Sequence, residues 1–326
     1  MIAPVSIVIP IRNEAPAALE ELLVGLKRQT VWPQEVIFAE ADPMDGVGKG
    51  EKFIADWWAS NAWEGGNCRV LPNPGVFPGA GRNVGINAAK GEWIAFLDAG
   101  ISPQPNWLKA LLAYSEEHKE KAVFGVGRFL GHGTVGRAVC ALSYGEGVIS
   151  PILPASLFHR EVFEKVGLFS CDLHVHEDTQ WVARYMKTYN LKDGEKPVNE
   201  EALVGYGHFP QSFSDTLVKW FRSGTYAVKA GAQKKQQAFY LLGLSGLLAS
   251  TSLFDSKAVL PVVIVTVLII RGCLIPMTRS SSWYWWKGEA LSLVVALPLS
   301  LVMDLAKGAG FLFGYGKKVM DIKVGG

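Results

Sequence analysis

Short β-branched runs alternate with amphipathic segments over the first hundred residues, and this alternation constrains the fold most strongly. Residues 5–10 (VSIVIP) and 35–42 (EVIFAEAD) are apolar runs of strand length. Between them, residues 17–29 (AALEELLVGLKRQ) place leucines at helical spacing, with acidic residues early and basic residues late. Such alternation predicts βα units around a mostly parallel sheet, which is an α/β fold.

The alternation continues to residue 98 and then becomes less regular. We expect further helices and strands at 51–62, 68–74, 80–90 and 92–98, and short helices at 158–166 and around 177–190. Parallel sheets bind ligands beyond the carboxyl ends of their strands. The acidic residues at such ends are Glu40, Asp42, Asp45 and Asp98. The carboxyl edge of the sheet is therefore the predicted ligand site.

Charge is divided unevenly along the chain, although its formal net charge is only +2. Residues 216–326 carry 13 Lys and Arg against 4 Asp and Glu, whereas residues 1–215 carry 19 against 26. A basic and apolar C-terminal part is expected to meet negative charge, such as membrane headgroups or a phosphorylated partner. We expect no nucleic-acid partner. The four widely spaced cysteines predict neither a disulfide scaffold nor a zinc site.

Three apolar stretches follow one another near the C-terminus, at 238–254, 258–270 and 290–303. A membrane-spanning helix needs ~20 mostly apolar residues. Residues 281–288 (SSWYWWKG) resemble an interfacial aromatic belt, and the basic residues before the first stretch favour a cytosolic side. We therefore expect a multi-pass protein of the cell membrane with two or three spanning helices. The alternative is a set of buried helices in a large soluble core. The N-terminus lacks the basic region of a signal peptide, so the first domain is expected in the cytosol.

Four motifs occur in order: VSIVIPIRNE, EVIFAEADPMDG, GRNVGINAAKGEWIAFLDAG and HEDTQW. Together they resemble family 2 of the inverting nucleotide-sugar glycosyltransferases, over roughly Val5 to Arg222. The resemblance implies the GT-A fold, a Rossmann-like αβα sandwich. It also implies a catalytic domain at 1–215. From the composition of the later residues we expect a basic and aromatic interfacial segment at 216–236 and C-terminal membrane helices with a basic tail at 237–326.

The resemblance places the nucleotide-sugar donor against the first three motifs. The expected donor-binding residues are Pro10, Arg12, Glu14, Glu40, Asp45, Arg82, Asn83 and Asp98. A helix N-terminus with an arginine suits a nucleotide or its phosphates. The plainer alternatives are a strand-to-helix turn around Glu14, a solvated acidic loop around Glu40 and a surface position for Arg82. The turn PMDG departs from the family pattern.

Asp98 matches the first aspartate of the family's D-x-D motif, which holds Mn²⁺ or Mg²⁺ on the donor diphosphate. Gly100 replaces the second aspartate. Magnesium needs few protein ligands, so a divalent cation is still expected at Asp98, with His208 as a candidate second ligand. The alternative is a donor held without metal by Arg82 and other cations. In either case we expect Asp98→Ala to abolish transfer.

The HEDTQW motif carries the expected general base, Asp178, with Glu177 beside it. In an inverting transfer a carboxylate takes the proton of the acceptor hydroxyl. The alternative is helix capping, worth ~0.3–1 kcal/mol, with no catalytic role. A lipid-linked or membrane-associated acceptor is expected near Lys219, Trp220 and Arg222. Two other functions stay open: a polyprenyl-phosphate glycosyltransferase that needs no general base, and a non-catalytic membrane scaffold with a degenerate GT-A domain.

Overall fold

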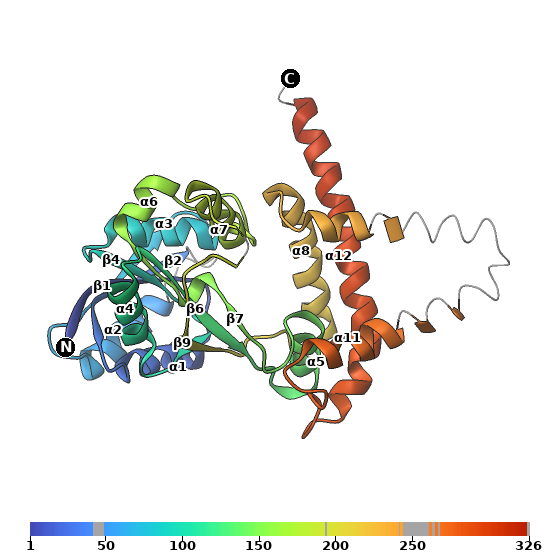
Figure 1. The fold of residues 1–326 in the computed structure, drawn as a ribbon, viewed down its shortest axis with the longest axis horizontal. Helices are drawn as coiled ribbons and strands as arrows, with labels where there is room; N and C mark the ends of the chain where they lie inside the picture. The colour runs from blue at the N-terminus through green and yellow to red at the C-terminus, as the bar shows by residue number, and fades with distance from the viewer. Residues whose placement is uncertain are drawn as a thin grey trace. The chain divides into compact units, whose positions relative to one another are not determined.

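The computed structural model describes residues 1–41, 49–192, 194–240, 242–243, 261–262, 265–266 and 268–324. It divides into two compact units (Figure 1). The N-terminal unit comprises Met1–Arg128 and Ile149–Tyr206, and the C-terminal unit comprises Phe129–Val148 and Gly207–Gly326. Two predicted site residues, Asp42 and Asp45, lie outside the described residues.

The N-terminal unit begins with the predicted parallel strands. The central strand β1 (Ile2–Ile11) pairs with β2 (Trp32–Ala41) on one side and β4 (Trp93–Phe96) on the other, and β3 (Asn67–Asn73) pairs with β2. All three pairings are parallel. The connecting helices are α1 (Pro16–Lys27), α2 (Lys49–Asn61) and α3 (Pro78–Ala88). The predicted βα units are thereby confirmed.

The rest of the sheet is antiparallel. Strand β8 (Leu157–His159) pairs with both β4 and β6 (Ala122–Phe129). Strand β7 (Ile149–Pro151) pairs with β6, and β5 (Ile101–Pro103) pairs with β9 (Val198–Tyr206). The sheet order is β3-β2-β1-β4-β8-β6-β9-β5. The predicted α/β class is confirmed, with a mixed sheet in which the parallel strands form one half.

Two apolar layers cover the sheet and give an αβα sandwich (Figure 1). One layer packs α1, α2 and α4 (Trp107–His118) against the sheet, and the leucines of α1 are fully buried there. The other layer packs α3, α6 (Arg160–Val166) and α7 (Glu177–Thr188). In this second layer Trp181 of α7 stacks on Phe169 at 5.1 Å. Alternating side chains of β4 face opposite layers, because successive strand residues point to opposite faces.

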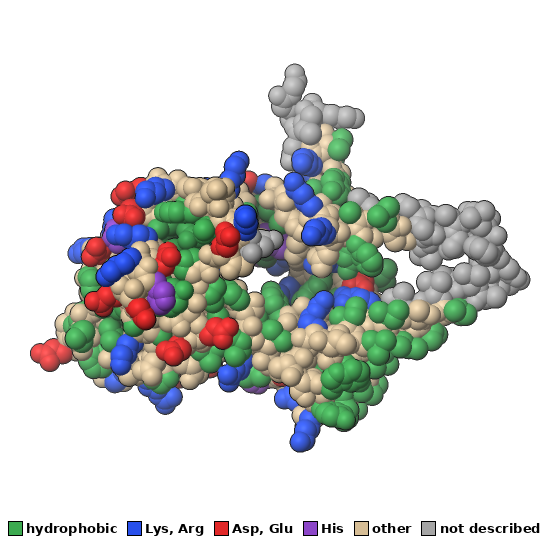
Figure 2. All heavy atoms as spheres, viewed as in Figure 1, with side chains coloured by type: hydrophobic (Ala, Val, Ile, Leu, Met, Phe, Trp, Pro, Cys, Tyr) green, Lys and Arg blue, Asp and Glu red, His purple; other side chains and the backbone are tan. Residues whose placement is uncertain are grey.

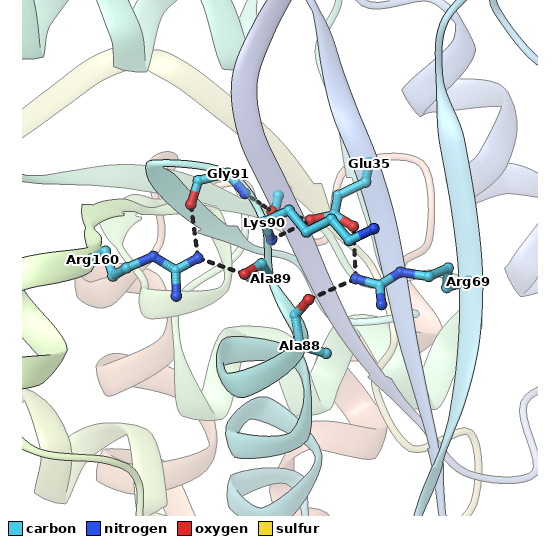
Figure 3. Close-up of polar contacts among 8 residues, drawn as sticks. Glu35, Arg69, Ala88, Ala89, Lys90, Gly91 and Arg160 are labelled. Atoms are coloured by element: carbon cyan, nitrogen blue, oxygen red, sulfur yellow. Dashed lines mark hydrogen bonds and ion pairs between the residues drawn. The ribbon is translucent and has the colours of Figure 1, made fainter.

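A buried carboxylate, Glu35, fixes the C-terminal end of α3 to the sheet (Figure 3). It accepts hydrogen bonds from Ser6 Oγ at 2.6 Å, from the backbone N–H of Lys90 at 2.6 Å and from Arg69 at 2.7 Å. Arg69 also donates to the carbonyl oxygen of Ala88 at 2.7 Å. A second arginine, Arg160, donates to the carbonyls of residues 89 and 91 (Figure 3). Both arginines therefore satisfy carbonyl groups at the end of α3 and beyond it.

We expect Glu35→Gln to lower the free energy of unfolding by about 3 kcal/mol at pH 7, because it leaves Arg69 without its carboxylate in a buried network. Burial opposes ionisation of Glu35, but the hydrogen bonds from Ser6, Lys90 and Arg69 outweigh it and lower its pKa. A lowered pKa stabilises the folded state above the unfolded-state pKa, and this stabilisation disappears as the pH falls. Denaturant titrations between about pH 3 and pH 7 measure the effect. The wild-type protein should lose more stability on acidification than Glu35→Gln, while the exposed control Glu64→Gln should follow the wild type.

The C-terminal unit contains α5 (Gly133–Ser143), α8 (Phe213–Ala230), the π-helical turn η2 (Ile270–Leu274), α11 (Ile275–Arg279) and the long α12 (Leu291–Val324). Glycines bring α8 and α12 into backbone contact. A Cβ atom on Gly310 would lie 2.2 Å from the carbonyl oxygen of Phe221, and one on Gly224 would lie 2.4 Å from that of Lys307. Gly310 and Gly314 form a G-x-x-x-G pair, a spacing that allows close helix packing.

Residues Leu291–Met320 of α12 are long and apolar enough to cross a membrane, judged by length and composition. This is the one such helix in the described part of the chain. Hydrophobic side chains gather over the C-terminal helices in Figure 2, and Leu291, Val294 and Leu305 are more than half exposed. Asp304 within α12 is paired by Arg271 in a bidentate contact at 2.7 and 2.8 Å. Of the first two predicted apolar stretches, 238–254 lies largely and 258–270 lies partly outside the described residues.

Candidate active site

One buried arginine joins three of the sequence motifs at the carboxyl edge of the parallel strands. Arg82 of α3 is 2% exposed. It donates from Nη2 to Asp98 Oδ1 at 2.8 Å and from Nη1 to Glu177 Oε1 at 2.5 Å. Asp98 follows β4, and Glu177 is the first residue of α7. The structure therefore places the GRN, DAG and HED motifs around a single guanidinium.

The local sequence explains how α7 reaches α3. The side-chain amide of Asn83 donates to the carbonyl oxygen of Phe169 and accepts from its N–H, both at 2.9 Å. Gly79 allows the same loop to close, since a Cβ there would lie 2.1 Å from the carbonyl oxygen of Ser170. His176 then takes a left-handed conformation (φ 71°) immediately before α7. These contacts hold the start of α7 beside α3, so that Glu177 reaches Arg82. They also occupy both polar atoms of the Asn83 side chain.

Both Nη groups of Arg82 donate to carboxylates. The Cζ atom of its guanidinium lies 5.6 Å from the centroid of the Phe169 ring. The surface position considered for Arg82 is wrong, because its partners lie inside the folded unit. In this arrangement Arg82 positions Asp98 and Glu177. A direct contact between Arg82 and donor phosphates stays a prediction.

Three carboxylates, those of Asp98, Glu177 and Asp178, lie around the single guanidinium of Arg82. Burial raises the pKa of Glu177, the charge of Asp178 raises it further, and Arg82 opposes both effects. Burial also raises the pKa of Asp98, with Arg82 opposing and Asp178 reinforcing the shift. Like charges close together favour uptake of a proton or a cation. The site is therefore suited to bind positive charge.

Asp178 lies next to this pair and is half-buried. Its Oδ1 accepts from the N–H of Thr179 at 2.6 Å and from Thr179 Oγ1 at 3.2 Å. Within the described residues its Oδ2 has no hydrogen-bond partner. A carboxylate with one occupied and one available oxygen can accept a proton from a ligand hydroxyl.

The remaining donor residues predicted in the first two motifs are placed as follows. Pro10 lies near the start of α3, since a Cβ atom on Gly81 would be 3.0 Å from the Cβ atom of Pro10. Arg12 donates to the carbonyl oxygen of Val76 at 3.4 Å, and Glu14 is exposed. Glu40, for which a solvated loop was the plainer alternative, lies within β2. Its two carboxylate oxygens accept the N–H groups of residues 50 and 51 at the start of α2, so it caps that helix.

Asp98 could hold a divalent cation with few other protein ligands. Its Oδ1 is bound to Arg82, its Oδ2 has no hydrogen-bond partner in the described chain, and its side chain is 36% exposed. Magnesium commonly uses one or two carboxylates together with substrate phosphates. Among the described residues no group of three or more His, Cys, Asp and Glu forms a metal cluster. The other predicted ligand, His208, is exposed and belongs to the C-terminal unit.

The predicted acceptor residues lie on α8 of the C-terminal unit. The Nζ of Lys219 lies 5.8 Å from the ring centroids of both Phe209 and Trp220. Burial lowers the pKa of Lys219. Arg222 lies on the same helix, three residues further along. An ammonium between aromatic faces is a candidate contact for an anionic group.

The first part of the chain is similar to a known protein family. Residues 6–167 match the family model described as Glycosyl transferase family 2, a span that runs from β1 to the end of α6. Over this span the chain is similar to family 2 glycosyltransferases. This similarity identifies the protein as a glycosyltransferase. The matched span contains Arg82 and Asp98, and the HED motif follows it.

A solved structure shows the same fold as this glycosyltransferase. It is a mannosyltransferase from Pyrobaculum calidifontis in complex with GDP-Man and Mn²⁺. The two chains are 14% identical, with a TM-score of 0.52, and the match covers 98% of this chain and 88% of the other. No curated protein sequence matches the glycosyltransferase significantly. The predicted GT-A fold is confirmed.

Proposed function

We propose that this protein transfers a sugar, with inversion, from a nucleotide-sugar donor to a lipid-linked acceptor at the membrane. The observation that carries the proposal is the grouping of Asp98, Glu177 and Asp178 around Arg82 at the carboxyl edge of the strands. The Pyrobaculum enzyme, which was solved with a nucleotide-sugar and Mn²⁺, supports the same class of donor and cation.

Each residue has a separate part in the proposed reaction. Asp178 takes the proton of the acceptor hydroxyl as its oxygen attacks the anomeric carbon. Asp98 would hold a divalent cation, which would supply positive charge beside the diphosphate of the donor. Arg82 and Glu177 keep Asp98 in position. The nucleoside lies towards Pro10, Arg12 and Glu14, at the carboxyl end of β1.

The membrane part of the proposal is carried by α12 and its exposed apolar side chains. We infer a catalytic domain in the cytosol and a multi-pass membrane anchor. Lys219, Trp220 and Arg222 of α8 then guide the acceptor at the membrane surface. Aromatic and basic residues are typical of such interfaces.

A second candidate is transfer to a polyprenyl phosphate. The half-buried ammonium of Lys219 favours it, since within the described residues no carboxylate pairs with this group and a phosphate would neutralise it. Phosphate is already anionic, so this reaction requires no general base. The Asp178 variant discussed below separates the two candidates.

Thermal unfolding with a panel of nucleotide-sugars tests the donor site directly. A nucleoside-diphosphate sugar present at 100 times its Kd, together with Mn²⁺, is expected to stabilise the protein by about 2.7 kcal/mol. This corresponds to a Tm increase of about 5 to 10 °C for a domain of this size. Asp98→Ala should remove the part of the shift that needs Mn²⁺. If no nucleotide-sugar shifts the Tm with or without Mn²⁺, the proposed donor site is contradicted.

A further inference from the structure

A cavity in the C-terminal unit lies apart from the groups assigned to glycosyl transfer. It has a volume of about 310 Å³ and is bordered by the end of α8, the helix at 234–240 and the C-terminal part of α12. Its lining residues are Val228, Gly231, Lys234, Gln237, Ala238, Tyr315 and Lys318. This volume falls at the lower end of the range of small-molecule sites, ~300–1,000 Å³.

The lining is positively charged. Lys234 and Lys318 border the cavity and no acidic residue does. In the described part of the chain neither lysine has an ion-pair or hydrogen-bond partner. Two unpaired ammonium groups at one cavity attract an anion, and phosphate is a common ligand of such groups.

Two polar lining residues, Tyr315 and Gln237, are held in place by hydrogen bonds within the protein. Tyr315 Oη donates to Gln237 Oε1 at 2.6 Å. Gln237 Nε2 in turn donates to the carbonyl oxygen of Ala232 at 2.6 Å. Gln237 itself is buried. The cavity therefore has a defined wall, and the groups that remain available for a ligand are the two ammonium groups.

Exposed apolar side chains come directly after the lining residues on the helix at 234–240 and on α12. Phe239, which succeeds the lining residue Ala238, is 70% exposed. Val319 and Met320, which succeed Lys318, are 53% and 57% exposed. Lysines that border a cavity beside exposed apolar side chains match an amphiphile with an anionic head and hydrocarbon chains.

We propose that this cavity binds the headgroup of an anionic phospholipid, with its phosphate on Lys234 and Lys318 and its acyl chains against Phe239 and Val319. This site is separate from the donor and acceptor sites and does not depend on glycosyl transfer. Bound lipid would join the helix at 234–240 to the C-terminal part of α12.

The test uses the full-length protein in a neutral maltoside detergent. Calorimetric titration compares short-chain phosphatidylglycerol with short-chain phosphatidylcholine and with inorganic phosphate. Each basic residue near an anionic lipid contributes a factor of about 5 in affinity, so the double variant Lys234→Gln/Lys318→Gln should bind phosphatidylglycerol about 30-fold more weakly. The double variant Lys234→Arg/Lys318→Arg should retain binding.

A matched control is the double variant Lys109→Gln/Lys187→Gln, which removes two exposed positive charges from the N-terminal unit. It should bind phosphatidylglycerol as the wild type does, and the lipid-free Tm of all variants should agree. Equal affinity of wild type and the Lys234→Gln/Lys318→Gln variant would overturn the proposal. Binding of inorganic phosphate or phosphatidylcholine as tight as that of phosphatidylglycerol would also overturn it.

Discussion

Asp178→Asn is expected to reduce the rate of glycosyl transfer to a hydroxyl acceptor about 10³-fold. The amide has nearly the same shape as the carboxylate but cannot take a proton, and general base catalysis contributes ~10²–10⁴-fold. Donor affinity should change little. Arg82 donates hydrogen bonds to Asp98 and Glu177, and the substitution at Asp178 leaves both of these in place. Single-turnover rates with purified protein, together with the Kd of the donor, separate these two effects.

The outcome also decides between the two proposed acceptors. Asp56→Asn, the same chemical change at an exposed position of α2, is the control and should keep the wild-type rate. A hydroxyl acceptor predicts that transfer is slowed in Asp178→Asn and not in Asp56→Asn. If Asp178→Asn transfers sugar at the wild-type rate, the general-base assignment is wrong and a phosphate acceptor is favoured.

Arg82→Met is expected to lower the free energy of unfolding by about 3–5 kcal/mol and to abolish transfer. The substitution leaves Glu177, whose side chain is only 7% exposed, as a buried charge without its cation. It also releases Asp98 from its ion pair. Arg82→Lys should be intermediate, because an ammonium is a point charge and lacks the fork that reaches both carboxylates. Guanidinium denaturation and transfer assays measure the two effects.

A second substitution separates stability from positioning. Arg82→Met/Glu177→Gln removes the uncompensated charge and should recover much of the lost stability, whereas transfer should stay absent. Arg128→Met, at an exposed position, is the matched control and should behave as the wild type in both assays. Wild-type transfer by the double variant would show that Arg82 does not position the catalytic groups.

Local sequence patterns were sufficient to predict the first half of the N-terminal unit. Periodic leucines predicted α1, and β-branched runs predicted β1 and β2, because both patterns arise from one buried face of one element. The apolar run that ends at Asp98 predicted β4, and Asp98 lies beyond the carboxyl end of that strand. The antiparallel half was not predicted, since β7 and β8 have three residues each and are too short to show a period.

The internal arrangement of the site depends on contacts that no local pattern reveals. Arg82 and Glu177 are 95 positions apart, so an arginine in a helix turn gave no sign that it would be buried. The same holds for Asn83, whose partner Phe169 is 86 positions away. Glu40 precedes the helix that it caps by about ten residues, beyond the spacing of an ordinary capping residue.

The excess of carboxylates over cations around Arg82 has a thermodynamic consequence for ligand order. Asp98, Glu177 and Asp178 face one guanidinium, so an unaccompanied diphosphate would add anions to a region that is already negative. In the proposed site a divalent ion and the donor would therefore be co-ligands, and each would lower the electrostatic cost of binding the other. Linkage requires this help to be reciprocal: the factor by which the ion tightens donor binding equals the factor by which the donor tightens ion binding.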